Sequence, residues 1–224
     1  MDLYSQSAVS LLLDLLHNMY SYYTIHNAVE QVLYKDKASK FYGFAYPVKN
    51  EIEIKEKLEF VKAQHPKATH HCYAYRIGID KNNYRANDDG EPSGTAGKPI
   101  LGQIDSFGVT NCLIIVVRYF GGTKLGVTGL IDAYKSCAKE TLQNTNIVLQ
   151  QIRKKYLIQC DYTITHAIFS LIQKVNATIE KQELEQQSTF VISIEQQYVL
   201  ELEQQFEALK ISLKHAMEIE KIEE

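Results

Sequence analysis

Two glycine-rich segments contain most of the residues that could bind a charged ligand or take part in chemistry. The first, residues 88–99, places three carboxylates, Asp88, Asp89 and Glu91, within four positions. The second, residues 118–130, leaves an apolar run typical of a buried strand and enters a helical pattern. Backbone N–H groups and the helix dipole favour an anion at such a junction. The pattern predicts a phosphate site, and a tight turn whose glycines allow close packing is the alternative.

The phosphate site is predicted from cations and glycine amides, because no known nucleotide motif fits. A Walker A loop would need glycine where Pro92 stands and Ser or Thr where Pro99 stands, and no G-x-G-x-x-G is present. The residues expected to contact phosphate or RNA are Arg118, Lys124, Gly121, Gly122, Gly126, Lys98 and Arg85.

Two histidines precede the first glycine segment and extend the candidate ligand site. The candidate carboxylates and histidines of this site are Asp88, Asp89, Glu91, His70 and His71. Neighbouring strand residues point to opposite faces, so the two histidines do not both line one pocket. The carboxylate spacing matches no calcium loop, so a turn in which Asp88 or Asp89 accepts hydrogen bonds from backbone N–H groups is favoured over a metal site. Cys72 follows an apolar alternation typical of the core. We assign no catalytic residue, metal ligand or cofactor.

Glycine and proline usage divides the chain. All eleven glycines lie between Gly43 and Gly129, and residues 130–224 contain neither glycine nor proline. The net charge is +3 over residues 21–148 and −4 over residues 149–224. We therefore predict an N-terminal extension over 1–20, a first domain over 21–145 and a second domain over 146–224.

Composition excludes several classes of protein. A total of 24 Lys and Arg against 27 Asp and Glu excludes a strongly basic nucleic-acid coat. The four cysteines are widely spaced without a C-x-x-C pair, which argues against a disulfide framework or zinc knuckle and favours a reducing cytoplasm. The apolar run over residues 8–16 is interrupted by Asp14 and is too short to span a bilayer, so no membrane partner is expected. Its spacing suits a short amphipathic helix, but a partly ordered N-terminal extension is favoured.

The first domain is predicted to mix helices and strands. Asn50 followed by Glu53 resembles a helix cap, and Pro66 would end that helix. The other predicted elements are strands over 24–33 and 41–48, a half-buried strand over 71–77, a strand covered on both faces over 112–117, and a helix from Val127.

The second domain gives a βαββαβ order, the ferredoxin-like arrangement. An alternating strand over 152–162 precedes a helix capped by Thr165. Strands over 178–183 and 189–194 follow, then a helix containing Leu202, Phe206 and Leu209. A last strand is expected to contain Ile211, Leu213 and His215.

The ordered motifs resemble the IMPACT/YigZ family over roughly residues 22–140. The similar runs are His-His-Cys at 70–72, the segment 88–99, Val-Arg-Tyr-Phe-Gly-Gly at 117–122, Leu-Gly at 125–126 and Gly-Leu-Ile-Asp-Ala-Tyr at 129–134. The remainder resembles the small ferredoxin-like domain of bacterial YigZ-type members. The chain departs from the family in its N-terminal extension and in lacking the interaction domain that precedes this module in eukaryotic members.

The resemblance implies an α+β protein of two domains. The first would share the fold of a ribosomal-protein domain and of EF-G domain IV, and the second would be similar to EF-G domain V. It also implies a cytoplasmic, non-enzymatic regulator of translation that binds RNA, the ribosome or a protein of the translation machinery. Two alternatives remain open. One is a protein-interaction module that uses exposed tyrosines such as Tyr73, Tyr75 or Tyr119; the other is a hydrolase-like enzyme acting on a small phosphorylated substrate.

Overall fold

A computed structural model describes residues 19–80, 82–213 and 217–222. The predicted mixture of helices and strands is confirmed, and the chain forms two compact units, one of them Tyr22–Gln150 and the other built mainly from Gln151 onward. The predicted boundary after residue 145 falls just before strand β7 (Ile147–Gln151). The apolar run over residues 8–16, for which an N-terminal extension was favoured over a short amphipathic helix, lies outside the described residues. No helix within the described ranges is both long enough and apolar enough to cross a membrane.

The first unit is built on a five-stranded antiparallel sheet with the order β2-β3-β6-β4-β5. Its strands are β2 (Val29–Asp36), β3 (Ser39–Pro47), β4 (His70–Ile77), β5 (Asn83–Asn87) and β6 (Cys112–Tyr119). A separate two-stranded sheet pairs β1 (Ser21–Ile25) with β7. The single strand predicted over 24–33 was wrong, because a bend at residues 26–28 divides it into β1 and β2.

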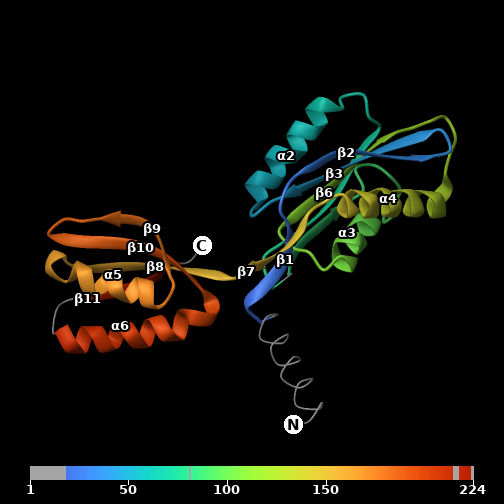
Figure 1. The fold of residues 1–224 in the computed structure, drawn as a ribbon. Coiled ribbons are helices and arrows are strands. Elements are labelled where there is room, and N and C mark those ends of the chain that lie inside the picture. The colour runs from blue at the N-terminus through green and yellow to red at the C-terminus, as the bar shows by residue number, and fades with distance from the viewer. Residues whose placement is uncertain (1–18, 81, 214–216, 223–224) are drawn as a thin grey trace, which may run out of the picture. The chain divides into compact units, whose positions relative to one another are not determined.

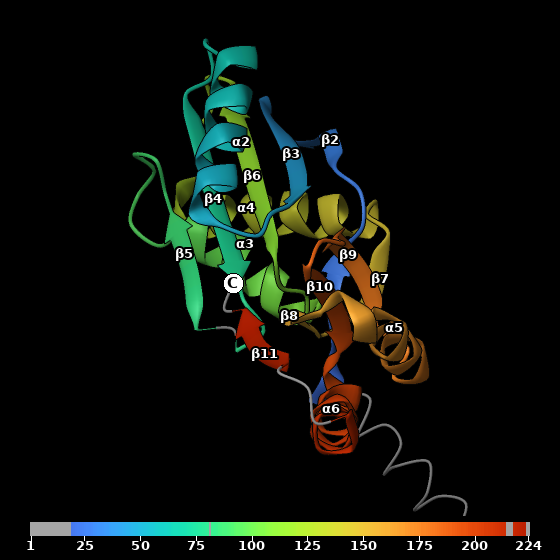
Figure 2. The ribbon, with the colours of Figure 1, turned by 90° about the vertical axis from the view of Figure 1, so that its left-hand side faces the viewer.

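Helices cover both faces of the five-stranded sheet. Helix α2 (Glu51–Gln64) lies on one face, and α3 (Gly97–Ser106) and α4 (Gly126–Gln143) lie on the other (Figures 1 and 2). The predicted cap of α2 is confirmed: the N–H of Glu53 donates to Asn50 Oδ1 at 2.9 Å. The helix ends at Gln64, before Pro66, as expected.

The central strands β4 and β6 are buried on both faces of the sheet. Strand β6 is buried from Cys112 through Arg118, as predicted. The prediction that β4 is half-buried was wrong, because both of its faces are covered. Cys72 packs in the core beneath α3 and α4, and Tyr75 packs in the core beneath α2. Both strands therefore hold side chains in fixed positions on either side of the sheet.

Helix α3 was not predicted, because its first turn contains the glycine and proline that favour a loop. Gly97 explains why glycine is needed there. A Cβ at this position would lie 2.4 Å from the backbone nitrogen of Asn87 in β5. Glycine allows the helix to begin directly against the strand.

Two glycines of α3 test this close approach. In Gly97→Ala, the methyl group would clash with strand backbone, and we expect a loss of about 1–3 kcal/mol of unfolding free energy. Gly102→Ala is the matched control. Among the described residues, its Cβ position has no heavy atom within 4 Å beyond its chain neighbours and the backbone of its own helix, and alanine favours a helix over glycine by up to about 1 kcal/mol. Urea denaturation measures both variants. Equal stability of the two would contradict the contact.

The second unit confirms the predicted βαββαβ order. Its elements are β8 (Arg153–Asp161), α5 (Thr165–Lys174), β9 (Thr178–Glu183), β10 (Gln187–Glu195), α6 (Val199–Leu213) and β11 (Met217–Ile222). The strands form an antiparallel sheet in the order β11-β8-β10-β9, and both helices pack on one face around Phe190, Ile192 and Phe206.

Two local predictions in this unit were wrong. Thr165 does not cap α5; its hydroxyl donates to the carbonyl of Tyr162, and Asp161 accepts from the N–H of Thr163 to start a preceding 3₁₀ turn. The predicted last strand is instead the end of α6, which contains Ile211 and Leu213. His215 lies outside the described residues.

Candidate functional site

The carboxylate of Asp88 organises the first glycine segment. Its Oδ1 accepts hydrogen bonds from the N–H groups of Ala96 at 3.0 Å and Gly97 at 2.8 Å, and its Oδ2 accepts from Gly94 at 2.8 Å. Burial opposes ionisation, but these three donors hold the pKa of Asp88 below its usual value. The prediction of a turn built on backbone N–H groups is thus confirmed for Asp88, whose charge also lies at the N-terminus of α3.

Glu91 and Arg118 form a buried ion pair. Glu91 Oε1 accepts from Arg118 Nη1 at 2.6 Å and from the hydroxyl of Tyr134 at 2.8 Å. The two charged side chains are only 4% and 7% exposed. The guanidinium carbon of Arg118 also lies 5.6 Å from the ring centroids of Phe41 and Phe120. The cation is therefore held by one carboxylate and two aromatic rings.

The two histidines point to different environments, as the strand alternation predicted. His70 Nδ1 lies 2.7 Å from the carbonyl of Asp89, so this nitrogen carries the hydrogen, and Nε2 faces Glu91 at 3.8 Å. His71 Nε2 instead lies 3.2 Å from the carbonyl of His65, at the end of α2. Burial lowers the pKa of His71, which favours the neutral ring.

Cys72 is a core residue in this network. Its thiol lies 3.0 Å from the carbonyl of Asp88 and 3.3 Å from the hydroxyl of Tyr134. Burial raises the pKa of both the Cys72 thiol and the Tyr134 phenol, so both stay protonated. A protonated thiol is a poor nucleophile, and the arrangement gives Cys72 a packing role.

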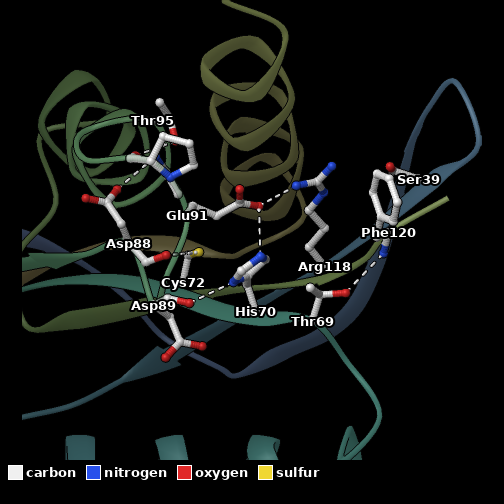
Figure 3. A network of polar contacts seen from close by, with 12 residues as sticks. Ser39, Thr69, His70, Cys72, Asp88, Asp89, Glu91, Thr95, Arg118 and Phe120 are labelled. Atoms are coloured by element: carbon white, nitrogen blue, oxygen red, sulfur yellow. Dashed lines mark hydrogen bonds and ion pairs between the residues drawn. The ribbon is translucent and has the colours of Figure 1, made fainter. Parts of the chain in front are cut away.

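The structure brings together the side chains of three predicted site residues, Glu91, His70 and Arg118. Figure 3 shows the side chain of Glu91 between those of His70 and Arg118, whereas the carboxylate of Asp88 points away from them, towards the backbone N–H groups at the start of α3. Tyr134 completes the cluster and was missed as a site residue, although it lies in one of the family-like motifs.

Arg85 does not join this cluster. Its position on the outer strand β5 is opposite Tyr75, in the second half of β4, whereas Arg118 is opposite His70 at the start of β4. Lys98 is exposed at the N-terminus of α3, where its charge helps to lower the pKa of Asp88.

The second glycine segment is anchored at one end and open at the other. Gly121 packs on the β2–β3 turn, where a Cβ would lie 2.0 Å from the backbone carbon of Ala38. Gly122 and Lys124 are exposed, and Gly122 and Gly126 have φ angles of +84° and +75°. Helix α4 begins at Gly126. Among the described residues, no side chain caps the first N–H groups of this long helix, and none of its first-turn residues is acidic.

A hollow of about 340 Å³ lies next to this loop, and we call it the basic–aromatic hollow. Its walls are Ala38, Lys40, Tyr42, Tyr119 and Phe120. The rings of Tyr42 and Tyr119 meet edge to face at 5.9 Å. Of the tyrosines expected to be exposed, Tyr75 is buried, whereas Tyr73 and Tyr119 are half-buried. The prediction was wrong for Tyr75 because α2 covers it.

Comparisons with known proteins agree with the motifs. A family model of the Impact N-terminal domain matches residues 37–142. The chain is 39% identical over 145 residues to the IMPACT family member YvyE of Bacillus subtilis. The aligned region covers 65% of this chain and 66% of that relative. An IMPACT family member of Haemophilus influenzae is 31% identical to this chain over 141 residues. The match covers 62% of this chain and 68% of that relative.

A solved crystal structure of a hypothetical protein covers 92% of this chain and 99% of its own, with a TM-score of 0.70 and 29% identity. The matches to the bacterial relatives span between 55% and 68% of the relatives' own length.

Proposed function

Because this chain belongs to the IMPACT family, we propose that it is a non-enzymatic regulator of translation that binds RNA at the ribosome through its first unit. The family resemblance supports a link to translation. A ribosomal-protein-like first unit and a ferredoxin-like second unit, similar to EF-G domains IV and V, are part of the same proposal. A cytoplasmic location follows from such a role.

The open glycine loop at the start of α4 is the observation that carries this proposal. Lys124 and the N–H groups around Gly126 present positive charge without a competing carboxylate in the first helical turn. A phosphate of RNA suits such a position, because it accepts several N–H donors and is attracted by the helix dipole. Gly122 lets the backbone approach the ligand closely.

We propose for Arg118 a structural role in place of the expected phosphate contact. Its guanidinium is committed to Glu91, and a phosphate would have to displace a buried carboxylate to reach it. We therefore assign the phosphate contact to Lys124 and the loop amides, and we assign to Arg118 the task of fixing the strand that leads into the loop.

Ribosome co-sedimentation across a salt series tests the proposal. Wild-type protein is expected to pellet with ribosomes at about 50 mM salt and to be released towards about 200 mM. Lys124→Glu should reduce pelleting several-fold at low salt and lower the salt dependence by about one counterion. Lys135→Glu is the matched control, since Lys135 is exposed further along the same helix. Absence of pelleting at every salt concentration would overturn the proposal. Recovery of a partner that survives nuclease treatment would favour a protein-interaction module instead.

A further inference from the structure

We infer that the basic–aromatic hollow binds one nucleotide of single-stranded RNA. This inference rests on the proposed function and specifies the form of RNA that the first unit recognises. The volume of about 340 Å³ falls within the range of small-ligand pockets. The lining offers the two chemistries that a nucleotide needs: aromatic rings for a base and a lysine for a phosphate.

Two lysines of the β2–β3 hairpin lie opposite each other beside the hollow. Lys35 on β2 is directly opposite Lys40 on β3, so their side chains share one face of the sheet. Among the described residues, no carboxylate pairs with either ammonium group. Asp36 is the next residue along β2, and its side chain belongs to the other face. Like charges opposite each other destabilise a sheet, and a phosphate bound between them would relieve the repulsion.

The turn next to this pair adds another cation. Lys37 is exposed in the β2–β3 turn with φ +49°, a conformation that favours glycine. The tip of this hairpin therefore presents Lys35, Lys37 and Lys40 around one end of the sheet. This is a local basic surface on a chain whose total charge is −3.

The aromatic walls of the hollow are held in place before a ligand arrives. Tyr119 is opposite Lys40 in the sheet, and its hydroxyl lies 2.9 Å from His65 Nδ1. The ring of His65 packs 5.6 Å from that of Tyr42. Phe120 is 47% exposed, and the guanidinium carbon of Arg118 lies 5.6 Å from the centroid of its ring. Such fixed rings can stack with an unpaired base, whereas a base inside a duplex is already stacked with its neighbours.

The hollow and the glycine loop form one continuous surface. Phe120 lines the hollow and leads directly into the loop. Gly121 rests on Ala38, which belongs to the opposite wall. A single strand of RNA with one base in the hollow can therefore continue along this surface towards Lys124.

Fluorescence anisotropy with a labelled oligouridine of about twelve nucleotides tests this inference, with a duplex RNA of equal length as the comparison. We expect tighter binding of the single strand. Lys35→Gln/Lys40→Gln should weaken that binding about tenfold or more at low salt, without lowering the urea midpoint, because the variant removes a like-charge pair. Phe120→Leu keeps the apolar body of the side chain and should weaken binding about tenfold through loss of stacking. Lys55→Gln/Lys62→Gln, which changes two exposed lysines of α2, is the matched control and should bind like wild type.

The outcomes separate this inference from the proposed function. Equal affinity for duplex and single strand, no binding of oligouridine, or unchanged binding by both hollow variants would overturn the inference. If ribosome pelleting sensitive to Lys124→Glu persisted in that case, the proposed function would stand without it. Oligouridine binding with the expected variant pattern but no ribosome pelleting would support the nucleotide pocket and overturn the proposed function.

Discussion

Glu91→Ala is expected to cost the first unit about 3–5 kcal/mol of unfolding free energy, because it leaves a buried guanidinium without its carboxylate. Arg118 is 6% exposed, and its Nε already has no hydrogen-bond partner among the described residues. The hydroxyl of Tyr134 would lose its acceptor as well. Both losses act on groups that water does not reach, so neither is compensated by solvent.

Urea denaturation followed by circular dichroism measures this effect. Glu56→Ala, which changes an exposed glutamate of α2, is the control and should stay within about 0.5 kcal/mol of wild type. The double variant Glu91→Leu/Arg118→Met should be more stable than Glu91→Ala, since it removes both charges together. A loss below about 1 kcal/mol in Glu91→Ala would show that Arg118 finds another partner.

Gly121→Ala is expected to cost about 3 kcal/mol, at the upper end of overpacking effects, because its new Cβ meets backbone on a neighbouring turn. The Cβ position lies 2.0 Å from the carbon and 2.1 Å from the oxygen of Ala38. Relief requires the β6–α4 loop to move away from the β2–β3 turn. That movement separates two walls of the basic–aromatic hollow, so oligouridine binding should fall together with stability.

Gly122→Ala separates this steric effect from backbone strain. Within the part of the chain that the structure describes, no heavy atom beyond its two chain neighbours lies within 4 Å of its Cβ position, but its φ is +84°. We expect a cost of about 1–2 kcal/mol from conformational strain. The urea midpoint and the oligouridine affinity of Gly121→Ala are to be compared with those of Gly122→Ala. A smaller effect in Gly121→Ala than in Gly122→Ala would contradict the packing of the loop against Ala38.

Local signals in the sequence explain which elements could be predicted. Helix α2 follows from Asn50, Glu53 and Pro66, which act within a few residues of one another. Helix α3 was missed because Gly97 and Pro99 normally indicate a loop, and only contact with β5 makes glycine necessary at position 97.

The C-terminal strand was placed too early for a related reason. Ile211 and Leu213 alternate as a strand would, and they equally continue the pattern of α6. Whether these residues form a strand or continue the helix depends on how they pack against the sheet, and a short alternation in the sequence does not distinguish the two.

The candidate site shows the same limit more strongly. The sequence identified Glu91 and Arg118 as chemically interesting, but it offered no way to pair them, because 27 positions separate them. Tyr134 is a further 16 positions along the chain and was not among the predicted site residues. The lysine pair of the hairpin required a strand register, which follows from the position of the two-residue turn between β2 and β3.

The pairing of β1 with β7 brings the beginning and the end of the first unit side by side. A domain whose N- and C-terminal ends lie next to each other can be fused to, or inserted into, another protein without a change in the path of its own chain. Recombination would then move residues 22–150 as one block, with its sheet and both glycine segments intact. The same adjacency makes this block suited to circular permutation, in which new ends are opened in an exposed loop and the old ones are joined by a short linker.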